Sequence, residues 1–146
     1  SRIEYRFLYF CENRKIMDFN LSIGLSAMET QRVTSNTTAL HYGSGLVEVF
    51  ATPAMIAMME KAAVNAVQQK LPEGYNTVGV EISVTHTKAT PKGMKVKTEA
   101  TLKEVNGNKL LFEVIAWDEE GVIGKGTHRR SIIETEKFMN RIRNNK

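Results

Sequence analysis

The stretch TPAMIAMMEKAAVNAVQQKLPEGYNTVGVEISVTH, residues 52 to 86, decides the fold because one helix signal is followed directly by one strand signal. Thr52 is a favoured N-cap residue, and Pro53 suits the first helical position. Apolar side chains then recur at helical spacing until residues 71–74 (LPEG) stop the pattern. These side chains are Met55, Ile56, Met59, Ala62, Ala63, Ala66 and Val67. We expect one helix of about four to five turns, with alanines that let a sheet approach closely.

Downstream of this helix, the sequence alternates between apolar and polar residues, as strands do. In the first strand Val78, Val80, Ile82, Val84 and His86 share one face. Similar patterns cover residues 94–103, 110–116 and 122–133, and Asn106-Gly107 is a strong hairpin signal. A strand over residues 27–34 and a short amphipathic helix over 135–143 complete the expectation.

One long helix followed by consecutive antiparallel strands indicates an α+β fold, in which the sheet wraps around a single central helix. On the outward face of the third strand, Leu111, Ile115 and Trp117 are too apolar for a plain solvated surface. We therefore expect a second copy to cover part of that surface, giving a homodimer or a dimer of dimers.

The 146 residues, 42% of them hydrophobic, are enough for one compact domain. We assign it to residues 17–146 and interpret residues 1–16, which show no clear period, as an extension that is not part of the domain. Neither a membrane-spanning run nor a secretory signal is present, so we expect a cytoplasmic protein without a membrane partner. Cys11 is the only cysteine, and the three histidines lie far apart, so neither a disulfide nor a metal site is expected.

The formal charge of +4 does not indicate a nucleic-acid partner. Residues 1–16 contribute a net +2 and the last six residues +3, which leaves the body of the chain near −1. A nucleic-acid binder more often carries a basic face interleaved with stacking aromatic residues. We therefore expect no nucleic acid to bind.

Three side chains within residues 52–86 are candidates for a hydrolytic site: Thr52, Glu60 and His86. Taken singly, each has an ordinary explanation, as a helix cap, the edge of a buried stripe and a hydrogen-bonded core histidine. Taken together they suit acyl transfer or hydrolysis, because a threonine hydroxyl needs a base, which a histidine oriented by a carboxylate can supply. The helix N-terminus adds N–H groups that can stabilise an oxyanion.

Four segments resemble the hot-dog acyl-CoA thioesterases related to fluoroacetyl-CoA thioesterase, namely residues 49–55, 59–60, 84–91 and 123–130. The resemblance covers about residues 17–140, and the spacing of Thr52, Glu60 and His86 matches the family's threonine, glutamate and histidine. It implies a hot-dog dimer that hydrolyses acyl-CoA thioesters, with active sites near the subunit interface. Coenzyme A is then part of the substrate, and no separate cofactor is implied.

The same resemblance implies a role for each residue. Thr52 is a nucleophile or a water-orienting hydroxyl, His86 the general base and Glu60 its partner. Phe50 and Gly79 are substrate contacts, Gly79 through its backbone to the thioester carbonyl. Strand alternation points Gly79 away from His86 unless a bulge intervenes.

The region 41–50, which we expect to cover the acyl pocket, departs from the fluoroacetyl-specific enzyme. Recognition of a carbon–fluorine bond therefore does not carry over, and we expect a small or medium acyl group in an adaptable pocket lined by alanine and methionine. The candidates for binding the CoA phosphates are Lys88, Lys92, Arg129 and Arg130, with Arg130 on the face of His128. The equal alternative is that all four are ordinary solvated charges.

Two other functions remain open at this point. A non-catalytic acyl-CoA binding module would keep the fold and the pocket but would not release thiol. An enoyl-CoA hydratase-like lyase on the same scaffold would use the histidine and the carboxylate to move protons without releasing thiol.

Overall fold

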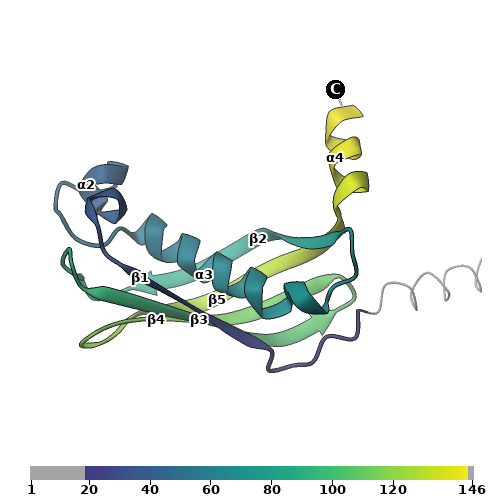
Figure 1. Cartoon of the computed structure of the whole chain (residues 1–146), viewed down its shortest axis with the longest axis horizontal. Coiled ribbons are helices and arrows are strands. Elements are labelled where there is room, and N and C mark those ends of the chain that lie inside the picture. The colour runs from purple at the N-terminus through teal and green to yellow at the C-terminus, as the bar shows by residue number, and fades with distance from the viewer. Residues whose placement is uncertain (1–18, 145–146) are drawn as a thin grey trace, which may run out of the picture.

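The computed structural model describes residues 19–144, and within them helix α3 (Thr52–Val67) lies across one face of a five-stranded antiparallel sheet (Figure 1). The strands are β1 (Ser26–Arg32), β2 (Tyr75–His86), β3 (Lys95–Asn106), β4 (Lys109–Asp118) and β5 (Gly121–Glu134). The smaller elements are helices α2 (Ala39–Tyr42) and α4 (Thr135–Asn144), and the 3-10 turns η1 (Ser35–Thr37) and η2 (Gln68–Lys70).

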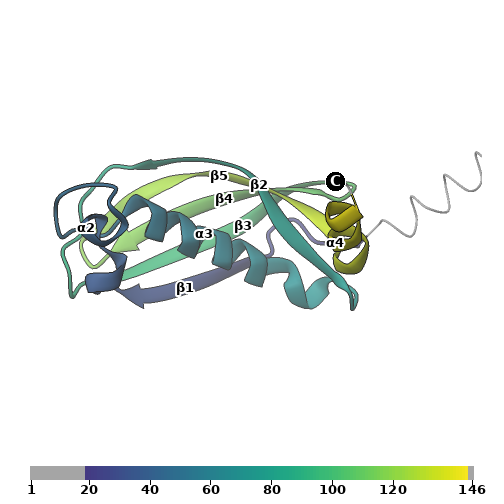
Figure 2. The same cartoon turned by 90° about the horizontal axis from the view of Figure 1, so that it is seen from above.

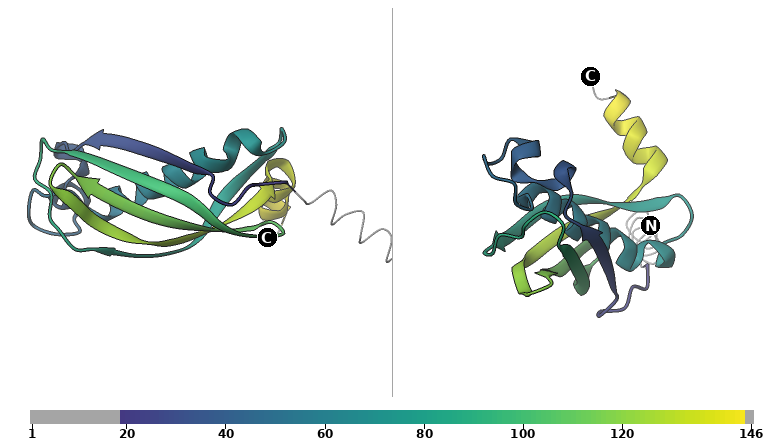
Figure 3. Two further views of the ribbon diagram at one scale, coloured as in Figure 1. Left: turned by 90° about the horizontal axis from the view of Figure 1, so that it is seen from below. Right: turned by 60° about the vertical axis from the view of Figure 1, so that its left-hand side comes forward.

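The strand order is β1-β3-β4-β5-β2, so that β1 and β2 form the two edges of the sheet. Seen from above, α3 runs along the curved sheet, with α2 at one end of the molecule and α4 at the other (Figure 2). The view from below shows that the outer face of the sheet carries no helix, and the rotated view shows α4 standing away from the body (Figure 3). The predicted sheet around one central helix is therefore confirmed.

The face of α3 that meets the sheet is built from small and flexible side chains. Its buried residues are Ala54, Met55, Met58, Met59, Ala62, Ala63, Ala66 and Val67. Met58 is buried where the sequence pattern favoured Ile56, which is only partly buried. The buried hydroxyl of Thr98 on β3 donates a hydrogen bond of 3.2 Å to the Met58 carbonyl, which ties the helix to the sheet.

Two glycines in β5 allow a further close approach. A Cβ atom on Gly126 would lie 2.0 Å from the Ser83 carbonyl oxygen and 2.7 Å from the Val84 Cα. On Gly124 a Cβ would lie 2.5 Å from the Thr85 carbonyl oxygen and 2.7 Å from the Met55 sulfur. Because backbone atoms occupy that space, only glycine lets β5 and β2 pair here without displacement.

The strict alternation expected for residues 77–86 is wrong at one position. The pairing of β2 with β5 shifts register between Gly79 and Glu81, so Val80 is a bulged residue and is 61% exposed. The extra residue reverses the faces, and Thr77 is buried where the pattern placed Val78 on the apolar side. Gly79 and His86 therefore point to the same side of the sheet, although their separation is odd.

The remaining strands and the C-terminal helix lie within a few residues of their predicted positions. None of the helices within residues 19–144 has the length and apolar composition needed to cross a bilayer. The predicted extension, residues 1–16, lies outside the described residues. The assignment of residues 17–146 to a single domain stays a prediction.

We predict that Gly126→Ala destabilises the protein by about 1–3 kcal/mol, because the new methyl group overpacks against the β2 backbone. Urea unfolding measures the loss. The matched control is Thr127→Ala, at the next and exposed position of β5, where the change should stay within about 0.5 kcal/mol. Equal midpoints for Gly126→Ala and the parent would contradict the close approach of the two strands.

Candidate active site

Thr52 and His86, 34 residues apart in sequence, are joined by a hydrogen bond of 2.8 Å between Thr52 Oγ1 and His86 Nδ1. The N-cap of α3 is Ala51, which provides no side-chain cap, and Thr52 is the first helical residue. The expectation that Thr52 caps the helix is therefore wrong. Its hydroxyl contacts the imidazole instead, beside a helix N-terminus whose first N–H groups are available to a ligand.

Several backbone contacts bring the two side chains together. His86 is the last residue of β2, and the Phe50 ring packs edge-on against its imidazole with the ring centres 6.3 Å apart. The Phe50 N–H donates to the Thr90 carbonyl, and the Ala51 N–H donates to the Thr37 carbonyl. The first bond holds the chain just before α3 against the chain just after β2, and the second holds it against η1.

A cavity of about 360 Å³ opens beside the pair. Its walls come from the segment before α3, from Thr52, and from the chain at the end of β2. The lining residues are Ala39, Ser44, Val49, Phe50, Thr52, His86, Thr87, Lys88 and Ala89. The expectation that residues 41–50 cover a pocket agrees with this lining, which includes Ser44, Val49 and Phe50.

The protonation state of His86 follows from its surroundings. Burial lowers the pKa of His86 below the ordinary value of 6.5, and the backbone of Lys88 opposes that effect in part. The imidazole is therefore neutral near pH 7. Its Nε2 atom is buried and has no hydrogen-bond partner. Only Nδ1 is thus in place to exchange a proton with another group, and the group it contacts is the Thr52 hydroxyl.

Glu60 does not join this pair within one protomer. It lies eight residues beyond Thr52 on α3, which is about 12 Å along a helix axis. Its carboxylate is instead 3.7 Å from the Arg130 guanidinium, with a side chain that is 45% exposed. The prediction that Glu60 orients His86 is therefore wrong for a single protomer, because the helix carries the two groups apart.

Gly79 lies with Glu60 rather than with His86. A Cβ at Gly79 would lie 3.2 Å from Glu60 Oε2 and 3.3 Å from both Arg130 Nη1 and His128 Cε1. The missing side chain leaves room for a small group above a charged cluster. Gly79, Glu60, His128 and Arg130 therefore form a second polar group, which we call the Gly79 cluster.

Arg130 occupies the interior of the Gly79 cluster. Its guanidinium donates to the Thr77 hydroxyl at 2.8 Å, to the Thr77 carbonyl at 2.9 Å and to His128 Nε2 at 3.0 Å. His128 Nδ1 in turn donates to the Glu81 carbonyl at 2.8 Å. Burial lowers the pKa of both His128 and Arg130, in each case opposed by the charge of Glu60. His128 is therefore a neutral acceptor, and Arg130 is held rigidly.

These contacts correct two expectations about CoA phosphates. Arg130 is only 5% exposed, so it is not available to a bulky phosphate in solution. Lys88 is held by Asp118 and Glu120. Arg129 is half-exposed and lies 3.4 Å from Glu81, and Lys92 is half-exposed and 3.9 Å from Glu48. Arg129 and Lys92 thus remain available as phosphate contacts.

Sequence reasoning missed Thr77 and Asp118 as parts of this region. Strict alternation places Thr77 on the face opposite Val78, because the bulge at Val80 leaves no signal in an alternating pattern. Asp118 lies just before residues 119–121 (EEG), a polar stretch that gives no sign that its side chain is fully buried. Among residues 19–144, no group of His, Cys, Asp and Glu side chains is arranged to hold a metal ion.

Comparison with known proteins gives relatives of one kind. A family model described as fluoroacetyl-CoA-specific thioesterase matches residues 33–136. The fluoroacetyl-CoA thioesterase of Streptantibioticus cattleyicolor is 45% identical over 96 residues, which are 66% of this chain and 69% of that protein.

Solved structures agree with that match. A structure of the fluoroacetyl-CoA thioesterase FlK superposes with a TM-score of 0.79 at 36% identity, covering 86% of this chain and 98% of FlK. A hot-dog-like protein from Thermanaerovibrio acidaminovorans gives 0.80 at 27% identity, covering 88% of this chain and 96% of that one. With the family model spanning most of its length, this chain belongs to the fluoroacetyl-CoA-specific thioesterase family and has the hot-dog fold.

Proposed function

We propose that the protein hydrolyses acyl-CoA thioesters to the free acid and CoA, with Thr52 and His86 at the reacting centre. The observation that carries this proposal is the 2.8 Å hydrogen bond between the Thr52 hydroxyl and a neutral imidazole. A threonine oxygen becomes a useful nucleophile when a base removes its proton, and a buried histidine with a low pKa is a base at neutral pH. Family membership supports the same reaction.

The geometry favours the route through an acyl-enzyme. Thr52 Oγ1 attacks the thioester carbonyl carbon while His86 Nδ1 takes the hydroxyl proton. The carbon–sulfur bond then breaks, and the imidazolium returns that proton to the departing CoA sulfur. His86 then takes a proton from water, the oxygen of which attacks the carbonyl carbon of the threonine ester. The bond from that carbon to Thr52 Oγ1 breaks, and the imidazolium returns the proton to Oγ1 as the acid is released. Direct activation of water by His86 is less favoured, because Nδ1 already contacts Thr52 and Nε2 is buried.

The substrate proposed is a CoA thioester with a short or medium acyl chain. The cavity beside Thr52 measures about 360 Å³, near the lower end of the roughly 300–1,000 Å³ typical of ligand pockets. Phe50 forms part of its wall. Structures of FlK have been solved with acetyl-CoA and with fluoroacetate and CoA, which supports the substrate class. Arg129 and Lys92 are the proposed phosphate contacts, and the reaction needs no separate cofactor.

Glu60 and Gly79 enter the proposal through a dimer. Strand β2 is an edge of the sheet, and an edge with free backbone groups can pair with a second copy. Antiparallel pairing of two β2 strands centred on Ser83, with the bulged Val80 left out of the register, would set Gly79 of one protomer opposite His86 of the partner subunit. The Gly79 cluster would then face the partner's Thr52, with the Gly79 backbone near the thioester carbonyl and Glu60 beside the reacting centre. We place this dimer in the cytoplasm, where CoA thioesters are metabolised.

Removal of either reacting group should abolish most of the activity. We expect Thr52→Ala and His86→Ala to lower kcat by about 10²–10⁴-fold, the usual contribution of a positioned base or nucleophile. Thr52→Ser, which keeps the hydroxyl, is the matched control and should retain far more activity. Thiol release from a panel of acyl-CoA esters measures the effect, with circular dichroism as the folding check. Parental rates for both alanine variants would exclude this site. If the parent protein binds acyl-CoA esters but releases no thiol, the non-catalytic binding module is favoured.

The pH dependence follows from the lowered pKa of His86. The base must be neutral, so kcat/KM should rise with pH through the His86 pKa and level off above it. Because burial lowers that pKa, the midpoint should lie below the ordinary value of 6.5. A pH–rate profile, compared with an NMR titration of the His86 ring protons, measures both quantities. A midpoint above 6.5 in either experiment would count against His86 as the buried base.

The shared site predicts complementation between two inactive variants. In a mixed dimer of Thr52→Ala and Glu60→Ala subunits, one of the two sites carries both defects and the other carries none. Subunits mixed in equal amounts and allowed to exchange should therefore regain roughly a quarter of the parental activity, given random pairing and independent sites. Each variant alone is the control. A monomer by size-exclusion chromatography, or no recovery after exchange, would contradict the shared site.

A further inference from the structure

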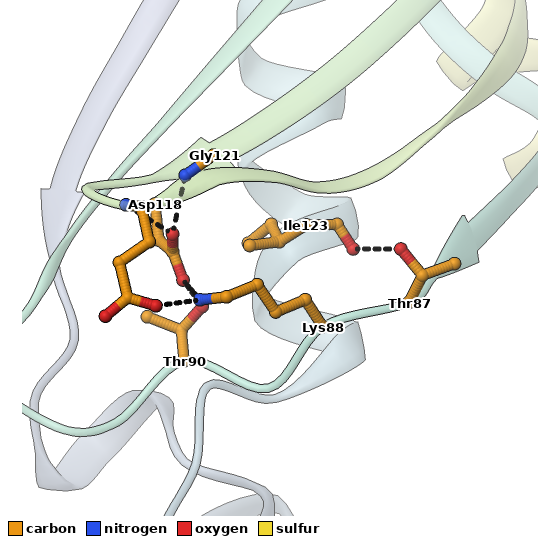
Figure 4. A network of polar contacts seen from close by, with 7 residues as sticks. Thr87, Lys88, Thr90, Asp118, Gly121 and Ile123 are labelled. Carbon is orange, nitrogen blue, oxygen red and sulfur yellow. Dashed lines mark hydrogen bonds and ion pairs between the residues drawn. The ribbon is translucent and has the colours of Figure 1, made fainter.

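The chain that follows His86 is anchored to a buried carboxylate that takes no part in the proposed chemistry. Asp118 is the last residue of β4, and its side chain is fully buried. Its Oδ2 accepts from the Lys88 ammonium and from the Thr90 hydroxyl, the latter at 2.8 Å. Its Oδ1 accepts from the N–H groups of Glu120 at 2.8 Å and Gly121 at 3.2 Å. Figure 4 shows Lys88 and Thr90 converging on this carboxylate from the loop after β2.

The carboxylate is ionised in this setting. Burial alone raises the pKa of Asp118, but the bonds from Lys88, the Glu120 backbone and Thr90 outweigh it, and the pKa is lowered overall. The pKa of Lys88 is correspondingly raised, first by its bond to Asp118. An ionised carboxylate has about four acceptor sites, and four donors occupy them here. Lys88 and Thr90 are therefore fixed relative to the β4–β5 turn.

Lys88 and Thr90 each connect Asp118 to the Thr52–His86 pair. The Thr90 carbonyl accepts a hydrogen bond of 2.8 Å from the Phe50 N–H. Phe50 lies two residues before Thr52, and its ring packs on the His86 imidazole. Lys88 lies two residues after His86, so its ion pair with Asp118 holds the chain that leaves the imidazole-bearing residue. The Thr87 hydroxyl donates to the Ile123 carbonyl at 3.3 Å, which continues the attachment to β5 (Figure 4). The Thr87 N–H donates to the same carbonyl at 2.7 Å.

The position of the imidazole matters because of the tautomer that the proposed reaction requires. Nδ1 of His86 can accept the Thr52 proton only if the ring proton sits on Nε2. The state of one imidazole nitrogen is set by the contact that the other makes. Nε2 is buried and has no hydrogen-bond partner, so the 2.8 Å contact between Nδ1 and the Thr52 hydroxyl is the one that favours a proton on Nε2.

We propose that Asp118 is a positioning residue for His86: by anchoring Lys88 and Thr90, it keeps the imidazole in the Nε2–H form with Nδ1 directed at the Thr52 hydroxyl. Asp118 touches neither substrate nor imidazole. It acts through residues 87–90, which follow His86 and are hydrogen-bonded to Phe50. The inference rests on the proposed function for its kinetic consequence, but the tautomer and the orientation are properties of the free protein.

Asp118→Asn tests the proposal, because an amide keeps the shape but offers one acceptor oxygen in place of two. We expect kcat to fall by about 10–100-fold, the range found for residues that hydrogen-bond to metal ligands and orient them. KM should change less than about threefold. We also expect the ¹⁵N shifts of His86 to move from the Nε2–H pattern towards a mixture of tautomers. Measurements belong well below the melting temperature of the variant, with rates normalised to folded protein.

Two further variants make the outcome decisive. Glu120→Gln removes the exposed partner of the same lysine and should leave kcat within about twofold, because exposed ion pairs contribute little. Thr90→Val removes a single donor to Asp118 and should shift kcat and the His86 spectrum in the same direction as Asp118→Asn, to a smaller extent. If Asp118→Asn does not fold, Thr90→Val carries the test.

A folded Asp118→Asn protein with parental kcat and parental His86 shifts would overturn the proposal and leave Asp118 a purely structural residue. A fall in kcat with an unchanged His86 tautomer would also overturn the proposal. If the parent protein hydrolyses no acyl-CoA ester, the proposed function fails, and the ¹⁵N spectra of the parent and the Asp118→Asn variant still decide whether Asp118 positions His86.

Discussion

Close contact between α3 and the sheet is the constraint on which the rest of this structure depends. The helix face that meets the strands consists of alanines and methionines, and β5 contributes glycines where the β2 backbone and Met55 come nearest. Small side chains bring the first turn of the helix within reach of the end of β2. Only at that separation can a hydroxyl on one element and an imidazole on the other share a hydrogen bond of 2.8 Å.

The same packing explains why the polar residues form two groups instead of one. A rigid helix separates Thr52 from Glu60 by about two turns, so a single protomer cannot gather both at His86. Strand β2 repeats this separation, with His86 at its end and Gly79 near its bulge. Each element therefore contributes one member to the Thr52–His86 pair and one to the Gly79 cluster. Two copies related by a two-fold axis would bring the Thr52–His86 pair of one protomer to the Gly79 cluster of the other.

Two buried charges in this protein hold the backbone in place. The Arg130 guanidinium donates to Thr77 and His128, and the Asp118 carboxylate accepts from Lys88 and Thr90. Buried charges are costly unless they are paired and fully hydrogen-bonded. Both of these are hydrogen-bonded, so they fix the strand ends at the two polar groups. The imidazole can then stay neutral beside an uncharged hydroxyl.

The sequence by itself determined the helix, the alternating strands, the hairpin at Asn106-Gly107 and the candidate residues Thr52 and His86. The helix, the strands and the hairpin rest on local periodicity and turn residues, which depend on near neighbours in the chain. The choice of Thr52 and His86 rests on the chemistry of a hydroxyl and a base and on the family resemblance. The bulge at Val80, the burial of Thr77 and Arg130, the separation of Glu60 from His86, and the Asp118 anchor were decided by the tertiary structure alone. Those features depend on which strand lies beside which, and on which side chains the sheet and the helix bring together, and neither is recorded in the spacing of residues along the chain.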